Sequence, residues 1–562
     1  RILAGIENVK KVELIGVQPE KIYIEMESSK LAQLGIDPTV LANAIAAQGA
    51  MSPAGMLETT SDNVYLRLPG PFENLDELRN MPIRINNRTF RLGDIVEIKR
   101  DYADPAEPKM FFNGQPAIGI AVSMEEGGNI LKLGEDLAAT IARIKKDLPL
   151  GLEIHQVFNQ PHVVKRSIGE FVQSLREAVI IVLLVSFLSL GIRSGVVVAL
   201  CIPLVIAGTF VGMRVMGIDL HKVSLGALII SLGLLVDDAI IAIEMMTVKL
   251  EQGWDRFRAA CFAYTATAFP MLTGTLITCA GFIPVGFAKG TAAEFTSSLF
   301  TVITISLLIS WFVSVLITPL FGYKLVKPKQ LTEHELYNTK FYRLFRRTLV
   351  WCLNHRKLVL AVTLVCFIGS IGLLKFVKQE FFPPSTRPEI LVEMTLPIGA
   401  SLAATEQEAK RFAGMIHGDS LIDNYSYYVG KGAPRFVLTT EPKLPATNYA
   451  QFVIVAKDLE ARDTLRQKIS QLLANEFPNV QHNVKLIQTG PPSAYPVMIR
   501  VTGYDHAKVR ELANQVAGVM AANPNLRNIN FDWYEKSKVM RLTVDQDKAR
   551  MLGIYSKSLA TS

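Results

Sequence analysis

Residues 223–246, VSLGALIISLGLLVDDAIIAIEMM, decide how the rest of the chain is interpreted. As a helix the stretch is long enough to cross a hydrocarbon core of roughly 30 Å. Two adjacent carboxyl groups, Asp237 and Asp238, lie in its middle, where each costs at least about 2.5 kcal/mol on insertion scales. Because ionisable groups inside a membrane helix mark functional sites, we interpret the pair as a proton- or ion-coupling site.

The composition supports a membrane protein. Of the 562 residues, 49% are hydrophobic, which is high for a soluble protein of this length. The chain starts at Arg1 and stops at Ser562 without a recognisable terminus, so we expect an internal fragment of a longer protein. Its five cysteines lie in or beside apolar stretches, which predicts neither a disulfide framework nor a CxxC metal site.

Six apolar stretches are candidate membrane spans. They cover approximately Phe171–Leu190, Val196–Met216, Val223–Met246, Ala266–Phe287, Phe295–Gly322 and Leu358–Phe376. The first is the weakest, because Arg176 and Glu177 precede its apolar core.

Basic residues predict the orientation of these spans. One set of alternate loops carries Arg214, Lys222 and Lys289, whereas the other set carries Arg193, Lys249, Arg256, Arg258, Lys324, Lys327, Lys329, Lys340, Arg343, Arg346, Arg347, Arg356 and Lys357. The positive-inside rule makes the second set cytoplasmic, so the formal charge of +8 indicates membrane topology and not nucleic-acid binding. Lys340–Trp351 is predicted to be a basic amphipathic helix on the inner surface. With six spans, the long polar segments 1–165 and 378–562 lie together on the other side, which is the periplasm in a bacterium with two membranes.

The two polar segments contain an internal repeat. Residues 30–42, KLAQLGIDPTVLA, and residues 548–560, KARMLGIYSKSLA, match at six positions. Both follow an alternating, strand-like run, at 21–27 and 539–545. We therefore expect slightly more than one repeat of a protein about twice this long, and parallel repeats are a known transporter design.

The polar segments are predicted to be α+β, built of βαβ units. Asp37 and Pro38 signal a helix start. Helical spacing of apolar residues recurs at 131–147 and 463–476, and strands are expected at 118–123 and 451–456. The fold class is thus a polytopic α-helical membrane protein of six transmembrane helices, flanked by two periplasmic α+β segments.

No motif for nucleotide, metal or covalent chemistry is recognisable. The sequence contains neither GxxxxGK[ST] nor HExxH, and its eight histidines are scattered. We therefore expect no cofactor, no metal and no enzymatic activity, and transport energised by an ion gradient, with protons as the coupling ion.

The aspartate pair supplies what such coupling needs. Two adjacent carboxylates in a low dielectric cannot both ionise at low cost, so at least one is expected to exchange a proton near ambient pH. Glu244 and Gly233 lie on the Asp237 face of the same helix, and Gly233 and Gly226 would permit close approach of a partner helix. The alternative is a structural pair neutralised by a Lys or Arg of another helix, which is compatible with the first interpretation.

Thr273, Thr275 and Thr278 of the next span are candidates to line a water-filled path. The alternative, which is the commoner one, is that each hydroxyl bonds back to the preceding turn of its own helix.

The segment 233–244, GLLVDDAIIAIE, resembles the fourth transmembrane helix of resistance-nodulation-division (RND) efflux transporters of the hydrophobe, or multidrug (acriflavine-resistance type), branch. The resemblance continues in order through NGQPAIGIAV (113–122), the RSG turn (193–195), KQEFFPP (378–384) and LPIGAS (396–401). The heavy-metal branch usually lacks the double aspartate, and no methionine triad suited to metal ligation is seen.

The resemblance implies an antibiotic-resistance pump of the bacterial inner membrane, driven by proton influx. It implies a homotrimer that works with a periplasmic adaptor (membrane fusion) protein and an outer-membrane channel. Asp237 and Asp238 match the proton-relay aspartates, whereas the Lys, Arg and Thr that answer them lie on helices absent here, so this fragment alone is not expected to pump. The order of the matching segments also implies the domain boundaries. One porter subdomain covers 1–51 and 101–165, and half of the docking subdomain lies between these parts at 52–100. The transmembrane domain covers 166–377, with an amphipathic linker near 323–357, the next porter subdomain covers 378–485, and the start of a further one covers 486–562.

Substrate contacts are harder to assign. Residues 430–444, GKGAPRFVLTTEPKL, occupy the place of the family's glycine-rich switch loop but depart from its aromatic-rich sequence. Phe452 falls where a pocket phenylalanine is expected, and the nearby Tyr427, Tyr428 and Phe436 are further candidates to line an apolar pocket. Ordinary core packing is the alternative for each of them, so no substrate range is carried over from the family.

Three functions remain open at this point. The favoured one is proton-driven export of hydrophobic or amphiphilic compounds, with the lipid bilayer as environment and no nucleic-acid partner. A metal-ion exporter of the sister branch is the second. A non-transporting membrane protein of related fold, such as a sterol-sensing receptor or a scaffold, is the third, and the intact aspartate pair counts against it.

Overall fold

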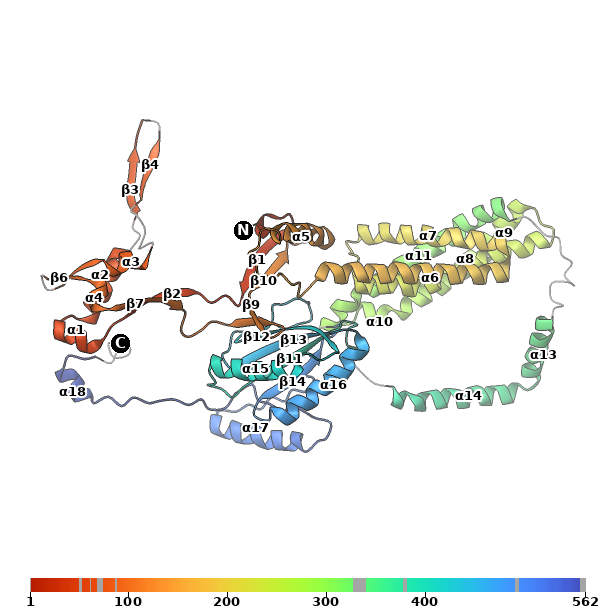
Figure 1. The fold of residues 1–562 in the computed structure, drawn as a ribbon. Coiled ribbons are helices and arrows are strands. Elements are labelled where there is room, and N and C mark those ends of the chain that lie inside the picture. The colour runs from red at the N-terminus through yellow and green to blue at the C-terminus, as the bar shows by residue number, and fades with distance from the viewer. Residues whose placement is uncertain are drawn as a thin grey trace.

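The structure is a computed structural model that describes residues 2–49, 53–60, 62–67, 74–85, 88–326, 340–377, 382–490 and 495–555. A bundle of long helices forms one end, and two α+β segments lie beyond the other end (Figure 1). The two termini of the bundle segment thus lead to the same side, as expected for an even number of spans.

Among the described residues, six helices are long and apolar enough to span a membrane, and they lie where the six spans were predicted. They are α6 (Gln160–Leu190), α7 (Ile192–Val215), α8 (Lys222–Glu251), α9 (Arg256–Gly281), α11 (Thr291–Leu325) and α14 (Arg356–Leu373).

Local capping moves two helix starts away from the predicted ones. α6 begins eleven residues before Phe171, because the Asn159 side chain accepts a hydrogen bond from the His162 amide and Pro161 occupies the first turn. α9 begins ten residues before Ala266, where Asp255 caps it. α9 also ends early, and the short α10 (Ile283–Gly286), with Pro284 in its first turn, follows. The amphipathic α13 (Lys340–Asn354) and the 3-10 turn η2 (Leu374–Phe376) flank α14.

The segment after the bundle folds as a split βαβ unit. Its elements are β11 (Glu389–Thr395), α15 (Leu402–Ile416), β12 (Ile422–Val429), β13 (Tyr449–Ala456), α16 (Leu459–Glu476) and β14 (Gln481–Leu486). The strands are antiparallel in the order β14-β11-β13-β12. One face of the sheet packs on α15 and α16 around Phe412, Phe452 and Phe477, so the predicted strand 451–456 and helix 463–476 are confirmed.

Two strands from the N-terminal segment complete this sheet. β8 (Lys109–Phe112) pairs with β12, and β9 (Gln115–Ala117) pairs with β8, so the sheet has six strands. The ring of Phe111 stacks on the ring of Tyr427 with centroids 4.6 Å apart, and Tyr427 stacks on Phe452 at 4.7 Å. The two polar segments therefore share a hydrophobic core.

The rest of the N-terminal segment forms smaller bodies. After the 3-10 turn η1 (Leu3–Gly5), β1 (Val9–Ile15) pairs with β10 (Gly119–Met124) beside α5 (Ile130–Ile144). The ribbon of β2 (Glu20–Glu25) and β7 (Glu97–Tyr102) leads away from the sheet to a unit of short elements. These are α1 (Ser28–Leu34), α2 (Pro38–Gly49), β3 (Pro53–Glu58), β4 (Asn63–Arg67), α3 (Leu75–Arg79), β5 (Pro82–Ile85), β6 (Arg88–Arg91) and α4 (Leu92–Ile95).

Apart from the β3–β4 hairpin, which projects away in Figure 1, the short elements share one core in which Leu31, Ile36 and Leu41 pack with Leu78 and Leu92. The boundary expected at residue 51 thus falls inside one hydrophobic core. Asp37 caps α2 as predicted, since its carboxylate accepts a 2.7 Å hydrogen bond from the Thr39 amide.

The repeat motif has the same backbone structure in both places. α1 ends at Gly35, with φ +64°, and the Ile36 amide donates to the Leu31 carbonyl at 2.9 Å. The later copy, α18 (Gln546–Met551), leads to Gly553, with φ +68°, where the Ile554 amide donates to the Ala549 carbonyl at 2.8 Å. Both are Schellman-type helix ends that need a glycine in the left-handed region. Leu559 and Ala560 of the repeat lie outside the described residues.

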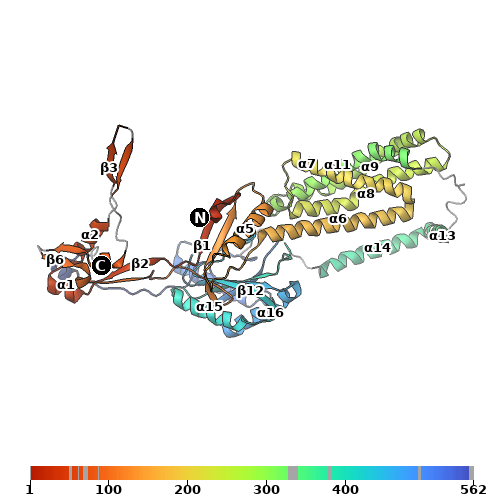
Figure 2. The ribbon, with the colours of Figure 1, turned by 45° about the horizontal axis from the view of Figure 1, so that its top comes forward.

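One expected strand is absent. Residues 539–545 have no strand structure, whereas their counterpart forms β2. A strand forms only where a neighbour satisfies its backbone groups, and β2 has β7. The preceding residues form α17 (His506–Ala521), which Figure 1 shows below α16. Figure 2 shows α15 and α16 on the opposite side of the sheet from β1 and α5.

Candidate functional site

The aspartate pair lies on α8, the most buried of the candidate spans. A reciprocal cap fixes the start of the helix: the Ser224 amide donates to His221 Nδ1, and the His221 amide donates to Ser224 Oγ. No proline interrupts the thirty residues that follow, so the helix runs unbroken from Lys222 to Glu251. It packs against α6, α7, α9 and α11.

The Asp237 side chain is exposed on the side of α8 away from its helix contacts. Gly233 and Glu244 are exposed on the same stripe of α8, together with Ile230 and Ile241. Apart from the nearby backbone and chain neighbours within α8 itself, no described atom lies within 4 Å of the position a Cβ would take at Gly233 or Gly226. This face of α8 is therefore open in the described part of the chain, and the partner helix expected against these glycines is not among the described helices.

Asp238 points to the other side. It is half-buried, and its carboxyl interacts with the Thr275 hydroxyl of α9. The Thr275 hydroxyl donates its proton to the Met271 carbonyl at 2.9 Å. A hydroxyl has one proton and two acceptor lone pairs. While the Thr275 hydroxyl donates to Met271, its oxygen can accept a hydrogen bond from a protonated Asp238. If the hydroxyl rotates, it can instead donate to an ionised Asp238.

The three candidate threonines of α9, Thr273, Thr275 and Thr278, all bond back to their own helix, as the alternative prediction had it. Thr273 donates to the Phe269 carbonyl at 3.0 Å and Thr278 donates to the Gly274 carbonyl at 2.9 Å. Thr273 is exposed, Thr278 is partly buried, and of the three only Thr275 is buried. Thr275 is thus the threonine that the fold brings to the aspartate pair.

Sequence reasoning missed the polar contacts behind the pair. Ser310 of α11 donates to the Leu235 carbonyl of α8 at 2.8 Å, two residues before Asp237. A small cavity between α7, α8 and α11 is lined by Ser310 and Ser314, and Ser314 Oγ is buried without a hydrogen-bond partner in the described residues. The signal was present in the sequence as hydroxyl residues spaced by four, at Ser306, Ser310, Ser314 and Thr318.

A second cavity lies in the polar segments. It has a volume of about 120 Å³ and separates the end of β1 from the residues before β8 and after β12. Its lining includes Leu14, Ile15, Lys109, Tyr428 and Lys431. Drug-sized ligands need roughly 300 Å³ or more, so the cavity is too small for them in this conformation.

The predicted pocket aromatics lie in three places. Tyr427 and Phe452 are fully buried in the core between the sheet and its two helices. Tyr428 lies on the opposite face of the sheet and lines the cavity, and burial raises its pKa to about 12. Phe436 lies on the 430–444 loop and packs with Phe158, the residue before the Asn159 cap of α6.

The 430–444 loop is anchored to several parts of the chain. The Ala433 amide donates to the Gln451 side chain at 2.7 Å, and the Thr439 hydroxyl donates to the Gln488 carbonyl at 3.0 Å. Lys431 lies 3.6 Å from Glu13 of β1. Any opening of the cavity beside Lys431 has to break some of these contacts.

A helix bundle with six candidate spans, α+β segments at one end and a carboxylate pair inside one span define a multi-pass α-helical membrane protein. The chain belongs to the AcrB/AcrD/AcrF family, whose model matches residues 1–561. The resemblance to RND transporters is thereby confirmed.

Characterised relatives agree with this membership. The chain is 25% identical over 570 residues to the multidrug resistance protein MdtC of Yersinia enterocolitica, and 24% identical over 571 residues to the proteins of the same name in Yersinia pseudotuberculosis and Yersinia pestis. Each alignment covers 98% of this chain and 54% of the relative. The chain thus spans about half the length of the curated relatives it matches.

Proposed function

We propose that the complete protein exports hydrophobic and amphiphilic compounds in exchange for protons. The observation that carries this proposal is the aspartate pair within α8, with Asp238 against Thr275 and Asp237 on the open face. An apolar span tolerates such carboxyls only where they are partnered or face a cavity, and they then serve ion or proton transfer. The name of the relatives, multidrug resistance protein, supports the substrate class.

The proposed proton step uses both sides of α8. A carboxyl of the pair takes a proton from the non-cytoplasmic side and gives it up toward the cytoplasm, and the neighbouring charge keeps both carboxyls from ionising together. Thr275 holds Asp238 in either protonation state, because its hydroxyl both accepts and donates. Glu244, nearer the cytoplasmic end, and Gly233 are assigned supporting positions on the face that meets the remainder of the protein.

Substrates are proposed to bind beside the 430–444 loop. The 120 Å³ cavity lined by Tyr428 and Lys431 is the candidate entry to this site. Since it is too small for a drug-sized compound, binding requires the loop to move away from β1. Tyr428, which lines the cavity, and Phe436, which lies on the moving loop, are the predicted pocket aromatics placed to meet a substrate, whereas Tyr427 and Phe452 support the sheet beneath.

The proposed assembly follows the family. The complete protein would be a homotrimer in the bacterial inner membrane that meets a periplasmic adaptor protein and an outer-membrane channel. The β8–β14 sheet would serve as a porter unit. The unit around Leu31 and Leu78, together with the 53–67 hairpin, would belong to the docking region that contacts the channel or the adaptor.

The test is dye accumulation in a pump-deficient bacterium with two membranes that carries the complete gene and its own adaptor. The variants are Asp238→Asn, which keeps the shape but cannot titrate, and Asp255→Asn as a matched control. Asp255 caps α9, and asparagine caps equally well. We expect the wild type and Asp255→Asn to lower dye uptake, a protonophore to abolish the effect, and Asp238→Asn to be inactive at equal expression. Export by Asp238→Asn at the wild-type rate would contradict the proton-relay assignment.

A further inference from the structure

The helix α13 carries an uncompensated positive charge. Lys340, Arg343, Arg346 and Arg347 lie on it, and the sequence contains no acidic residue from 336 to 379. In the described part of the chain none of these four cations has an ion-pair partner, whereas eighteen ion pairs are formed elsewhere. An exposed cluster of this kind is suited to an external anion.

The cations of α13 share one side of the helix. Lys340, Arg343 and Arg347 follow the spacing of one helical face, with Arg346 beside them. Phe341, Phe345 and Leu349 follow the same spacing on the opposite side, and their side chains are 71%, 57% and 50% exposed. No residue of α13 is buried, so both faces are free to meet a partner with a charged and an apolar part.

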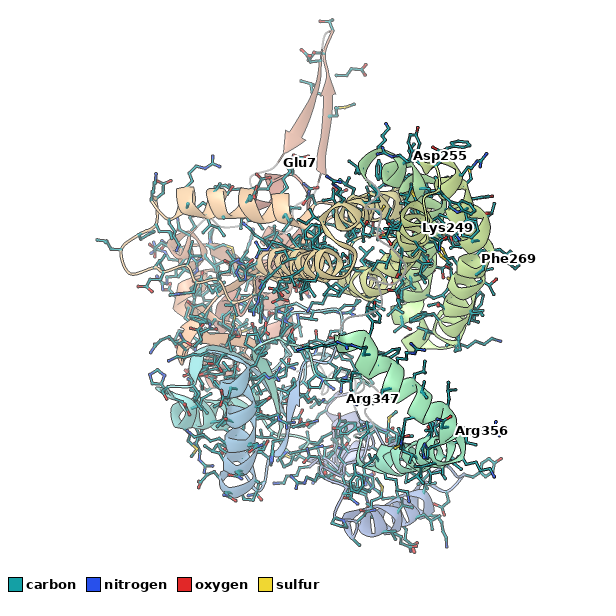
Figure 3. The ribbon with its side chains drawn as sticks, turned by 90° about the vertical axis from the view of Figure 1, so that its right-hand side faces the viewer. Glu7, Lys249, Asp255, Phe269, Arg347 and Arg356 are labelled. Atoms are coloured by element: carbon teal, nitrogen blue, oxygen red, sulfur yellow. The ribbon has the colours of Figure 1, made fainter. Side chains whose placement is uncertain are left out.

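The position of α13 fits the surface of a membrane. It lies in the chain between the spans α11 and α14, on the side that the positive-inside rule makes cytoplasmic. Figure 3 shows Arg347 and Arg356 with Lys249 and Asp255 at the end of the molecule that faces the viewer. In Figure 1, α13 runs across the line of α14 and does not continue it. If α14 spans the bilayer, α13 lies along its surface.

The corner between the two helices is fixed by local contacts. The His355 ring stacks on Trp351 with centroids 4.9 Å apart, and His355 Nδ1 lies 3.0 Å from the Trp351 carbonyl oxygen. Arg356 and Lys357 follow at once and open α14. Arg356 and Lys357 thereby add two positive charges to those of α13, at the end of α14 that would lie at the membrane surface.

We propose that α13 and the first turn of α14 bind anionic phospholipids of the cytoplasmic leaflet. Arg343, Arg346 and Arg347 contact the headgroup phosphates, which guanidinium groups bind in a two-pronged manner. Phe341, Phe345 and Leu349 enter the acyl boundary beneath. A basic amphipathic helix beside a span binds anionic lipid in preference to neutral lipid, because each basic residue near such a surface contributes about 1 kcal/mol.

The experiment titrates the complete, detergent-solubilised protein with short-chain phosphatidylglycerol, with phosphatidylcholine of the same chain length and with inorganic phosphate, and counts bound lipids by native mass spectrometry. The test variant is Arg343→Gln/Arg346→Gln/Arg347→Gln. The matched control, Arg256→Gln/Arg258→Gln/Lys324→Gln, removes the same charge from the same side of the membrane. A third variant with lysine at 343, 346 and 347 keeps the charge.

We expect phosphatidylglycerol to bind at least about tenfold more tightly than phosphatidylcholine, and the triple glutamine variant to lose this preference. The control should keep it, and the lysine variant should weaken it by only a few fold. Equal binding of the two lipids, equal loss in the control, or displacement of the lipid by equimolar inorganic phosphate would each overturn the proposal. The outcome does not depend on whether the protein exports dyes.

Discussion

The rings of Phe158 and Phe436 stack with centroids 3.9 Å apart and planes 4° from parallel. Phe158 lies just before the cap of α6, the first membrane helix of this chain, and Phe436 lies on the 430–444 loop. The Arg387 guanidinium lies 5.6 Å from the centre of the Phe436 ring, and its Nη1 is 3.4 Å from the side-chain oxygen of Gln160, the first residue of α6. The start of a membrane helix is thus joined to the loop beside the candidate substrate cavity.

Breaking this stack is expected to slow export. A stacked aromatic pair contributes about 1 kcal/mol beyond its buried area. Phe436→Ala and Phe158→Ala should each lower the initial rate of dye export, and the double variant should be no worse than the poorer single one, because both remove the same contact. Phe436→Tyr keeps the ring and serves as the control. Additive losses in the double variant would show that the two rings act separately.

A second prediction concerns the hydroxyl beside Asp238. Thr275→Val keeps the shape of the side chain and removes the group that interacts with the carboxyl. Loss of one such hydrogen bond costs about 1 kcal/mol, so we expect the export rate in proteoliposomes with an imposed proton gradient to fall about fivefold. Thr275→Ser keeps the hydroxyl and should export normally.

Thr273→Val is the internal control for that experiment. Thr273 bonds back to its own helix at 3.0 Å as Thr275 does, but it is exposed on α9. It should export at the wild-type rate. The assignment of Thr275 fails if the two valine variants behave alike.

What the sequence predicts well is what depends on neighbours along the chain. The six spans and the cap at Asp37 follow from local hydropathy and side-chain capping, and the structure confirms them. The aspartate pair could be identified for the same reason, because two carboxyl groups within an apolar stretch are recognisable from the sequence alone.

The features that the sequence does not predict depend on contacts between residues far apart in the chain. The pairing of Phe111 with Tyr427 joins strands more than three hundred positions apart, and nothing in either strand encodes its partner. The three candidate threonines of α9 have the same local pattern, yet of these only Thr275 reaches Asp238. Ser310 meets Leu235 because α11 packs closely on α8, and helix packing is set by the whole bundle.

Two of the predicted pocket residues, Tyr427 and Phe452, are expected to affect the stability of the folded protein and not substrate binding. Tyr427 is fully buried, and its hydroxyl has no hydrogen-bond partner in the described residues. Tyr427→Phe removes this unsatisfied group, so we expect equal or higher thermal stability, by up to about 1 kcal/mol, with export unchanged. Phe452→Ala opens the core and should cost about 3–5 kcal/mol, seen as loss of protein from the membrane.

These two variants separate packing from substrate contact. If Phe452 only packs, Phe452→Leu should restore the amount of protein and the export of every dye together. Restored protein with a changed dye preference would instead assign Phe452 to the substrate site.

An ion-pair cluster holds the two polar segments together. Glu406 of α15 lies 2.7 Å from Lys109 of β8, which belongs to the N-terminal segment, and 2.7 Å from Lys410. Burial by itself raises the pKa of Glu406, but the hydrogen bonds and charges of the two lysines outweigh it, and the pKa lies below the ordinary value of 4.5. The carboxylate is therefore favoured by the folded state.

A carboxyl whose pKa is lower in the folded state adds stability above its unfolded pKa and loses it as pH falls through the folded pKa. At pH 7 we expect Glu406→Gln to weaken the β8–β12 pairing by about 1 kcal/mol, seen as roughly fivefold faster hydrogen exchange of the β8 amides in the complete protein. The difference from the wild type should shrink below pH 4.5 and vanish once Glu406 is protonated. Glu408→Gln removes the next acidic residue of α15, which pairs with Arg411 and not with Lys109, and should leave the β8 amides unchanged. A difference at β8 that persists at pH 3 would show that Glu406 acts through its shape and not through its charge.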